Sequence, residues 1–343
     1  MIDFRYHLVS IVAVFLALAI GIVLGSTELQ GPTYNILNRT TARLQGEYDQ
    51  AHSQLITAQA QASEGDAYAQ AVEPAVLRGL LSGQRLLIVT EPGAQSSVVS
   101  GITTAAIDAG ATVTGQVNLQ PKFFDTSGTT QDSLNQTTSD VAQTAGLTLD
   151  TSGTYQQQAA QVIASEILTT SPRSPAIQSA GSNQGTNAGT MLQAYAASQF
   201  LSTTGQPGTP ATLAVVVTPQ NAPSNGSADL LDQLLIPLVQ ELSAKDSATV
   251  VVGSSSASGA GSPIAVLRSN DVSNKVSTVD DAELVSGQTV AIQALAILLG
   301  GGKAGSYGFA ANGATAVAPS PAPSPTASVS ATATSSPTKK VKL

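Results

Sequence analysis

The sequence contains no cysteine and no tryptophan, and it has only two histidines and two methionines in 343 residues. Without thiols the chain forms no disulfide framework, carries no cysteine nucleophile and holds no thiolate-bound metal. Of the soft or imidazole ligands that remain, Met191 stands alone, and His7 and His52 lie far apart in the sequence. We therefore expect no cluster of soft metal ligands within one chain.

Charge is also scarce. Asp, Glu, Lys and Arg make up 10% of the residues, against about 25% in an average globular protein. The net charge is −8, and the basic residues gather only at Lys339, Lys340 and Lys342. A protein that binds nucleic acid needs a basic surface to neutralise phosphates. We therefore expect no nucleic-acid partner.

Catalytic motifs are missing as well. The sequence has no Gly-x-Ser-x-Gly elbow, no His-Glu-x-x-His helix and no Gly-Lys-Ser/Thr phosphate loop. From residue 75 onward it has no histidine at all, which excludes a Ser-His-Asp triad in that part of the chain. We therefore predict that the protein is not an enzyme and has no evident cofactor.

A long apolar run is present near the N-terminus. Leu8 to Leu24, with Leu16 near its middle, contains no charged residue. As a helix this run rises about 26 Å at about 1.5 Å per residue, close to the hydrocarbon thickness of roughly 30 Å. A cleaved signal peptide is the alternative, because Val23 and Gly25 precede a cutting position at Ser26. The leader lacks a cationic region and the run exceeds an ordinary signal core, so an uncleaved anchor is favoured.

The orientation of the anchor follows from its flanking charges. Arg5 and the free amino terminus precede the run, and Glu28 is the first charge after it. Positive charge stays on the cytoplasmic side. We therefore predict a single-pass membrane protein of the cell envelope, with the rest of the chain outside the cytoplasm.

The opening DFRYHLVSIVAVFLALAIGIVLGS resembles the start of the MctB family of actinobacterial copper-transport proteins. Three later stretches also resemble that family, namely SGQRLLIVTEPGA (82–94), AGATVTGQVNL (109–119) and VSTVDDAELVSGQTVAIQALAILLGG (276–301). The polar insert near 170–190 and the tail after Ala310 depart from it. The resemblance implies copper homeostasis or efflux, an outer-membrane location and an oligomeric membrane channel. Residues 75–310 offer one thioether and neither thiol nor imidazole, so copper coordination there is not expected.

The segment after the anchor carries a thin seven-residue repeat. Its clearest apolar positions are Leu37, Leu44, Tyr48 and Leu55, spaced alternately by three and four. This spacing predicts a coiled-coil stalk that joins several copies of the chain, and His52 copies meeting there are one route to a metal site. The alternative is a helix packed on its own domain. Because proline disfavours helical geometry in the residue before it, the helix is predicted to end at Glu73.

The next part of the sequence alternates strands with helices. Predicted strands are 85–90, 112–117, 213–218, 248–253 and 276–281, and predicted helices are 96–109, 155–168, 191–201, 227–242 and 286–299. Continuous apolar strands separated by helices favour a mostly parallel sheet covered on both faces. The expected fold class is α/β, with an anchor (1–26), a stalk (27–73), an α/β domain (75–310) and a disordered tail rich in Pro, Ser, Thr and Ala (311–343).

The carboxyl ends of the predicted strands offer one candidate site. Thr90, Glu91, Thr218, the loop 253–256 and the pair Asp280 and Asp281 would converge there. Carboxylates suit Mg²⁺ or Ca²⁺, so Glu91, Asp280 and Asp281 are the candidate metal ligands. The alternative is that the two aspartates start a helix and 253–256 is a solvated loop. The runner-up function is a non-enzymatic envelope scaffold that oligomerises through its coiled coil and binds partners by its α/β domain.

Overall fold

The computed structural model describes residues 4–150, 152–168, 184–219, 228–244, 248–255, 262–309 and 313–319. Within these ranges, side chains are not described at 4–5, 26–35, 184–188 and 228–234. The chain divides into two compact units, Met1–Ala67 and Tyr68–Leu343.

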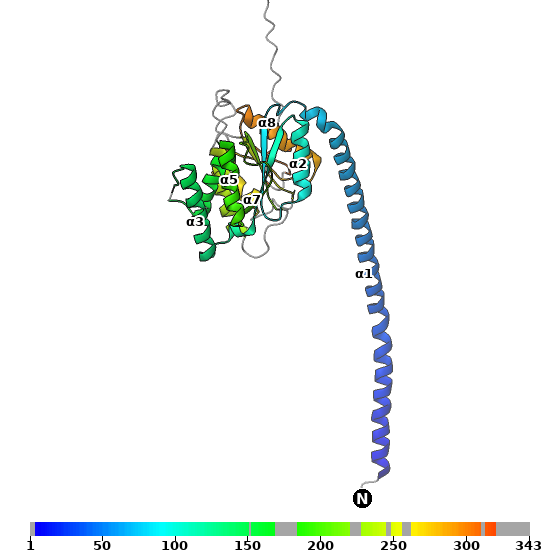
Figure 1. Ribbon diagram of the computed structural model, residues 1–343. Helices are drawn as coiled ribbons and strands as arrows, with labels where there is room; N and C mark the ends of the chain where they lie inside the picture. The colour runs from blue at the N-terminus through cyan, green and yellow to red at the C-terminus, as the bar shows by residue number, and fades with distance from the viewer. Residues whose placement is uncertain are drawn as a thin grey trace, which may run out of the picture. The chain divides into compact units, whose positions relative to one another are not determined.

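One helix, α1 (Phe4–Leu77), contains 74 residues, and the predicted anchor and stalk are both part of it (Figure 1). The predicted end at Glu73 is wrong, since Pro74 lies inside the helix. Tertiary contacts explain the extension. Leu77 is fully buried, and the Thr289 hydroxyl donates to Glu73 Oε1 at 3.1 Å. Packing of this last part of the helix outweighs the proline penalty.

A single sheet forms the centre of the second unit. Its strands are β1 (Arg85–Thr90), β2 (Thr112–Leu119), β3 (Leu201–Gly205), β4 (Leu213–Val217), β5 (Ala248–Val252), β6 (Ser277–Val279) and β7 (Ser306–Tyr307). Among the described residues the order is β3-β2-β1-β4-β5-β6-β7, and every pair is parallel except β2 with β3. The predicted α/β class with a mostly parallel sheet is confirmed.

The helices of this unit divide between the two faces of the sheet. Their bounds are α2 (Ser96–Asp108), α3 (Gly128–Ala145), α4 (Tyr155–Ile167), α5 (Gln184–Ala197), α6 (Ala228–Ala244), α7 (Pro263–Ser269) and α8 (Val285–Leu299), with 3-10 turns η1 (Pro121–Phe124) and η4 (Asp271–Asn274). Helices α2 and α8 pack with the end of α1 on one face, and α3 to α7 cover the other (Figure 1).

The strands alternate strictly between these two cores. In β1, Leu86 and Ile88 face the α2 and α8 side, whereas Leu87 and Val89 face the other helices. Successive side chains of a strand point to opposite faces, so a strand covered on both sides is apolar throughout. This is why RLLIVT, LAVVV and ATVVV could be recognised as strands from sequence.

The core strands 85–90, 213–217 and 248–252 and the helices 96–108 and 285–299 lie at or within a residue of their predicted positions. The helices and strands without a predicted counterpart are α3, α7, β3 and β7. Of the predicted helix 191–201, the residues up to Ala197 belong to α5, and Leu201 is the first residue of β3. The polar joint predicted as a surface loop falls mostly on residues 169–183, which lie outside the described residues, and its last part is the start of α5.

The chain continues past the predicted end of the domain. Thr315 N–H donates to the Ser306 carbonyl at 2.8 Å, and Gly308 N–H donates to the Ala316 carbonyl at 3.1 Å. Ala316 thereby forms a parallel bridge with Tyr307 on β7. The predicted start of disorder at 311 is thus too early for 313–319. The remainder of the predicted tail, 320–343, lies outside the described residues.

Candidate functional site

The sheet order reverses between β1 and β4, which is where ligands bind in open α/β sheets. Here the two loops that follow these strands are joined, because Ala94 forms an antiparallel bridge with Pro219. Gly93 adopts φ +87°, and a Cβ there would lie 3.4 Å from Pro219 Cβ. The usual crevice between these loops is therefore bridged by backbone contacts.

A cleft of about 570 Å³ opens beside that bridge, at the carboxyl ends of β1 and β2. Glu91 lines it and is 5% exposed, and its N–H donates to the Val217 carbonyl at 3.0 Å. Thr90 Oγ1 donates to Asn118 Oδ1 at 2.7 Å. Of the predicted crevice residues, the cleft thus gathers Thr90 and Glu91 from one strand end.

Thr218 and Gly253, also predicted to meet at the crevice, form backbone contacts farther along the sheet. Thr218 Oγ1 donates to the Val252 carbonyl at 3.2 Å, and Gly253 N–H donates to the Val279 carbonyl at 2.9 Å. Ser256 lies outside the described residues. These residues continue the pairing of adjacent strands, and neither Thr218 nor Gly253 lines the cleft.

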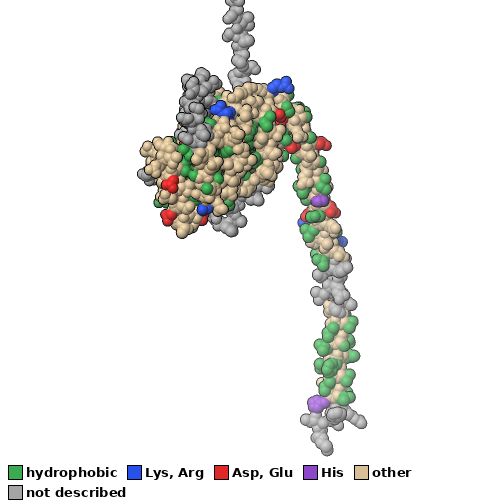
Figure 2. Space-filling model, viewed as in Figure 1, with side chains coloured by type: hydrophobic (Ala, Val, Ile, Leu, Met, Phe, Trp, Pro, Cys, Tyr) green, Lys and Arg blue, Asp and Glu red, His purple; other side chains and the backbone are tan. Residues whose placement is uncertain are grey.

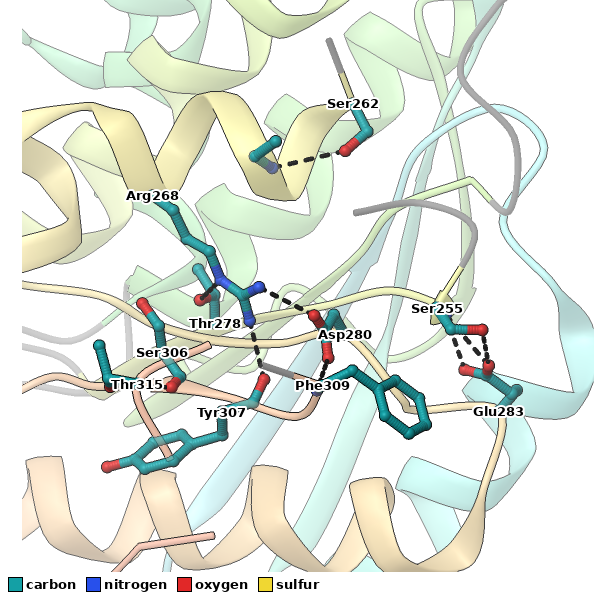
Figure 3. A network of polar contacts seen from close by, with 11 residues as sticks. Ser255, Ser262, Arg268, Thr278, Asp280, Glu283, Ser306, Tyr307, Phe309 and Thr315 are labelled. Atoms are coloured by element: carbon teal, nitrogen blue, oxygen red, sulfur yellow. Dashed lines mark hydrogen bonds and ion pairs between the residues drawn. The ribbon is translucent and has the colours of Figure 1, made fainter. Parts of the chain in front are cut away.

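Asp280 lies at the end of β6 and is fully buried in an ion pair (Figure 3). Its Oδ2 accepts from Arg268 Nη1 at 2.8 Å, and its Oδ1 accepts from Phe309 N–H at 2.9 Å. Gly308, at φ +117°, passes so close that a Cβ would overlap Asp280 Oδ1. Both carboxylate oxygens are thus used for structure, which argues against the predicted role of Asp280 as a metal ligand.

Arg268 completes this network from α7. Its Nε donates to Thr278 Oγ1 at 2.9 Å and its Nη2 donates to the Tyr307 carbonyl at 2.8 Å (Figure 3). One guanidinium therefore joins α7, β6 and β7. Sequence reasoning missed Arg268, because it belongs to no motif and its partners come from separate segments.

Asp281 and Glu283 follow in the turn before α8. The Glu283 carboxylate accepts from Ser255 Oγ at 2.6 Å and from Ser255 N–H at 3.0 Å (Figure 3). Asp281 is 6% exposed. Burial, together with the negative charges of Asp280 and Glu283, raises the pKa of Asp281 to about 6. The alternative that the two aspartates start a helix differs from the structure, in which α8 begins at Val285 with Leu284 as its N-cap.

The three predicted metal ligands do not form one site. Across the described residues, no group of three or more His, Asp or Glu side chains is arranged to hold a metal ion. Glu91 lines the cleft at β1, whereas Asp280 and Asp281 follow β6, and β4 and β5 separate the two strands. A hard-cation site at the strand ends thus receives no geometric support.

The polar side chains of the cleft that sequence reasoning missed come from β2. Gln116 and Asn118 point to the same face, and Gln116 Nε2 donates to Asn118 Oδ1. Gln120, just after the strand, donates from Nε2 to Ser202 Oγ at 3.2 Å. The signal was available in the sequence as three amides spaced by two residues, at 116, 118 and 120.

Met191, the one thioether of the second unit, is 5% exposed and packs between α3 and α5. It lines a cleft of about 280 Å³ together with Asp140 and Thr144 of α3. Nearby, Tyr195 is buried with its hydroxyl donating to Thr138 Oγ1 at 3.1 Å. Among the described residues that line this cleft, Met191 supplies the one soft donor.

The first unit presents two apolar surfaces on α1. Tyr6–Gly25 is long and apolar enough to cross a membrane, and the predicted anchor residues Leu8, Leu16 and Leu24 are 55%, 61% and 60% exposed. Apolar side chains cover this stretch on all sides in view (Figure 2). A helix that is apolar and unburied along about 30 Å fits a lipid environment.

Farther along α1, the predicted seam is also exposed in the single chain. Leu37, Leu44, Tyr48 and Leu55 are each more than half exposed. His52 stacks on Tyr48 with ring centroids 5.9 Å apart, and Arg43 forms an ion pair with Glu47 at 3.0 Å. Within Met1–Ala67 the described side chains of this segment are solvent-accessible, as a surface for a further helix would be.

Comparison with known proteins gives consistent matches over most of the chain. The family described as "Copper transport outer membrane protein, MctB" matches residues 1–319. The copper transporter MctB of Mycobacterium tuberculosis (strain ATCC 25618 / H37Rv) is 28% identical over 315 residues, covering 90% of this chain and 96% of that protein. Copper transporter MctB of Mycobacterium leprae (strain TN) is 27% identical over 326 residues, covering 92% and 99%.

Proposed function

Because the chain belongs to the MctB family of copper transport outer membrane proteins, we propose that it is a membrane-anchored envelope protein that takes part in copper homeostasis or efflux. The observation that carries this proposal is the match over residues 1–319, which includes the anchor and nearly all of the described second unit. The apolar, exposed stretch Tyr6–Gly25 supports the membrane attachment. The outer membrane is the location that the family description suggests.

The donor chemistry limits how copper is handled. In the second unit the sequence has no thiol or imidazole, and its lone thioether, Met191, is buried between helices. The accessible carboxylates are hard ligands that hold copper weakly. Copper is therefore the cargo of an assembly or of a partner protein, and one chain does not bind it tightly.

Several copies of this chain would have to associate to form a path for an ion. The exposed stripe of Leu37, Leu44, Tyr48 and Leu55 supports association through the stalk. In such an assembly the anchors of several copies gather at the membrane, and His52 of each copy lies beside the stalk axis. We infer that copper handling depends on this association.

The experiment uses a strain that lacks the gene and measures its growth and metal content in copper. Loss of the protein is expected to raise copper sensitivity, the intact chain to restore resistance, and Leu44→Asp with Leu55→Asp to fail to restore it. Purified full-length protein is expected to lose a competition for Cu(I) against a chelator of micromolar affinity. Unchanged copper sensitivity would contradict the proposed function, and a one-to-one nanomolar site would contradict the indirect mechanism.

The second candidate is a non-enzymatic scaffold of the envelope that binds partners by its α/β domain. The observation in its favour is the open cleft of about 570 Å³ at β1 and β2, which could receive part of a partner molecule. Such a scaffold would leave copper sensitivity unchanged when it is deleted. The same strain therefore separates the two functions.

A further inference from the structure

The cleft at the ends of β1 and β2 is lined by side chains of two chemical kinds. Neutral hydrogen-bonding groups come from Ser96, Ser100 and the amides Gln116, Asn118 and Gln120. Apolar surface comes from Pro92, Val99 and Pro121, among others. With about 570 Å³ of space, the cleft falls in the size range of small-molecule sites in proteins. It therefore suits a ligand with a polar edge and an apolar face.

The charges around this cleft exclude an anionic ligand. Its lining, among the described residues, contains neither Lys nor Arg, and the carboxylate oxygens of Glu91 are buried. A phosphate or carboxylate placed here would find no cation in the lining to offset its charge. The ligand that fits is uncharged or carries hydrogen-bond donors.

The hydrogen-bonding groups of the lining further restrict the class of ligand that fits the cleft. An amide side chain both donates and accepts. Sugar hydroxyls match this set, since each hydroxyl donates once and accepts as well, while the C–H face of the ring packs on apolar side chains. We propose that this cleft is a binding site for an uncharged saccharide, held by the partly exposed amides Gln116, Asn118 and Gln120 on its hydroxyl edge.

A second cleft extends the first one. It has a volume of about 460 Å³ and shares Gln120 and Pro121 with the cleft at β1 and β2. Gln199 and Ser202 add further neutral hydrogen-bonding groups to it. Lys122, which also lines it, is already engaged, with Nζ donating to the Ser198 carbonyl at 2.9 Å. The two together accommodate a chain of more than one sugar unit.

The test uses the full-length chain in a zwitterionic detergent without a sugar head group. Maltotriose, chitotriose, adenosine and glucose 6-phosphate are titrated separately, with binding followed by saturation-transfer NMR and calorimetry. We expect at least one trisaccharide to bind. Ser100→Tyr, at an exposed position of α2 that lines the cleft, is expected to weaken this binding by about tenfold or more.

A matched control keeps the test independent of folding. Ser97→Tyr places the same side chain at an exposed position of α2 outside the cleft lining, and it should leave the affinity unchanged. Gln120→Ala should weaken binding without filling the cleft. No binding of either trisaccharide, equal binding by the Ser100→Tyr variant, or binding of adenosine or glucose 6-phosphate alone would each overturn the proposal.

Discussion

At the scale of single residues, the buried Arg268–Asp280 ion pair is expected to make a large contribution to the stability of the second unit. The Asp280 side chain is fully buried and that of Arg268 is 7% exposed. Removing one partner of a buried pair leaves an uncompensated charge, at a cost of about 3–5 kcal/mol. Arg268→Met is therefore expected to lower the free energy of unfolding by about that amount, measured by circular dichroism in denaturant.

Two further variants check the origin of this loss. Arg268→Met combined with Asp280→Asn removes both charges and keeps an Oδ1 acceptor for Phe309 N–H, so it should be less destabilised than the single change. Lys275→Met removes an exposed cation nearby and is expected to change stability by less than about 0.5 kcal/mol. Equal losses in the single and double variants would show that packing, and not the charge, explains the effect.

Asp281 is expected to make the stability of the folded protein decrease as the pH rises. Its pKa of about 6 in the folded chain exceeds the ordinary value of 3.8, so the folded state holds this proton more tightly than the unfolded state does. Its ionisation therefore destabilises the fold above about pH 6, and this contribution is relieved as the pH falls from about 6 toward 4. Asp281→Asn is expected to raise the melting temperature at pH 7.5 and to flatten its change down to pH 5.

The control for this prediction is Asp132→Asn, an exposed aspartate of α3. This substitution should leave the pH dependence of the melting temperature the same as in the wild-type protein. An Asp281→Asn variant that melts at the same temperature at pH 7.5, with an unaltered profile, would show that this carboxyl is not the source of the effect.

At the scale of elements, α1 carries the exposed apolar surface through which we propose that copies of the chain associate. Exposed Ile36 and Ile56 widen the apolar surface beside the seam of Leu44 and Leu55. Full-length protein in detergent is expected to form a dimer or a larger species by light scattering, and Leu44→Asp with Leu55→Asp should convert it to a monomer. Charges buried without partners at a helix interface cost several kcal/mol.

The matched variant carries the same two charges on the opposite side of the helix. Ser53 lies two residues before Leu55 and Ala60 lies five after it, so Ser53→Asp with Ala60→Asp places both charges in the outward position of the seven-residue repeat. It should leave the assembly intact. If the wild-type protein stays monomeric at high micromolar concentration, the predicted association of copies through α1 is wrong.

At the scale of the whole molecule, the sequence predicted those parts whose residues are uniformly apolar. Strand β1 and helix α8 were found because almost every position is buried or periodic. Helix α3 was missed because Leu134, Thr138, Val141 and Ala142 supply its buried side in an otherwise polar segment. Strand β3 was missed because Leu201 is its one buried residue.

The candidate site was less predictable than the fold. The rule that strand ends converge indicated Thr90 and Glu91, which line the cleft, but it gave no way to see that Ala94 and Pro219 form a bridge and that Thr218 does not line the cleft. The spacing of residues along the chain also could not reveal that Arg268 forms an ion pair with the Asp280 carboxylate. Contacts of this kind depend on how separate segments meet, and a local pattern does not contain that information.

The unbroken helix from Phe4 to Leu77 also fixes a rotational phase between membrane and stalk. Continuing the seven-residue repeat of the seam backwards through the same helix reaches Val9, Ala13, Leu16, Ile20 and Val23. A straight helix drifts only about 20° per heptad from this repeat, and supercoiling removes the drift. If copies join along the stalk, this aliphatic stripe of each anchor is turned toward the common axis. An aqueous ion path along that axis would then have no polar side chain from the stripe to line it.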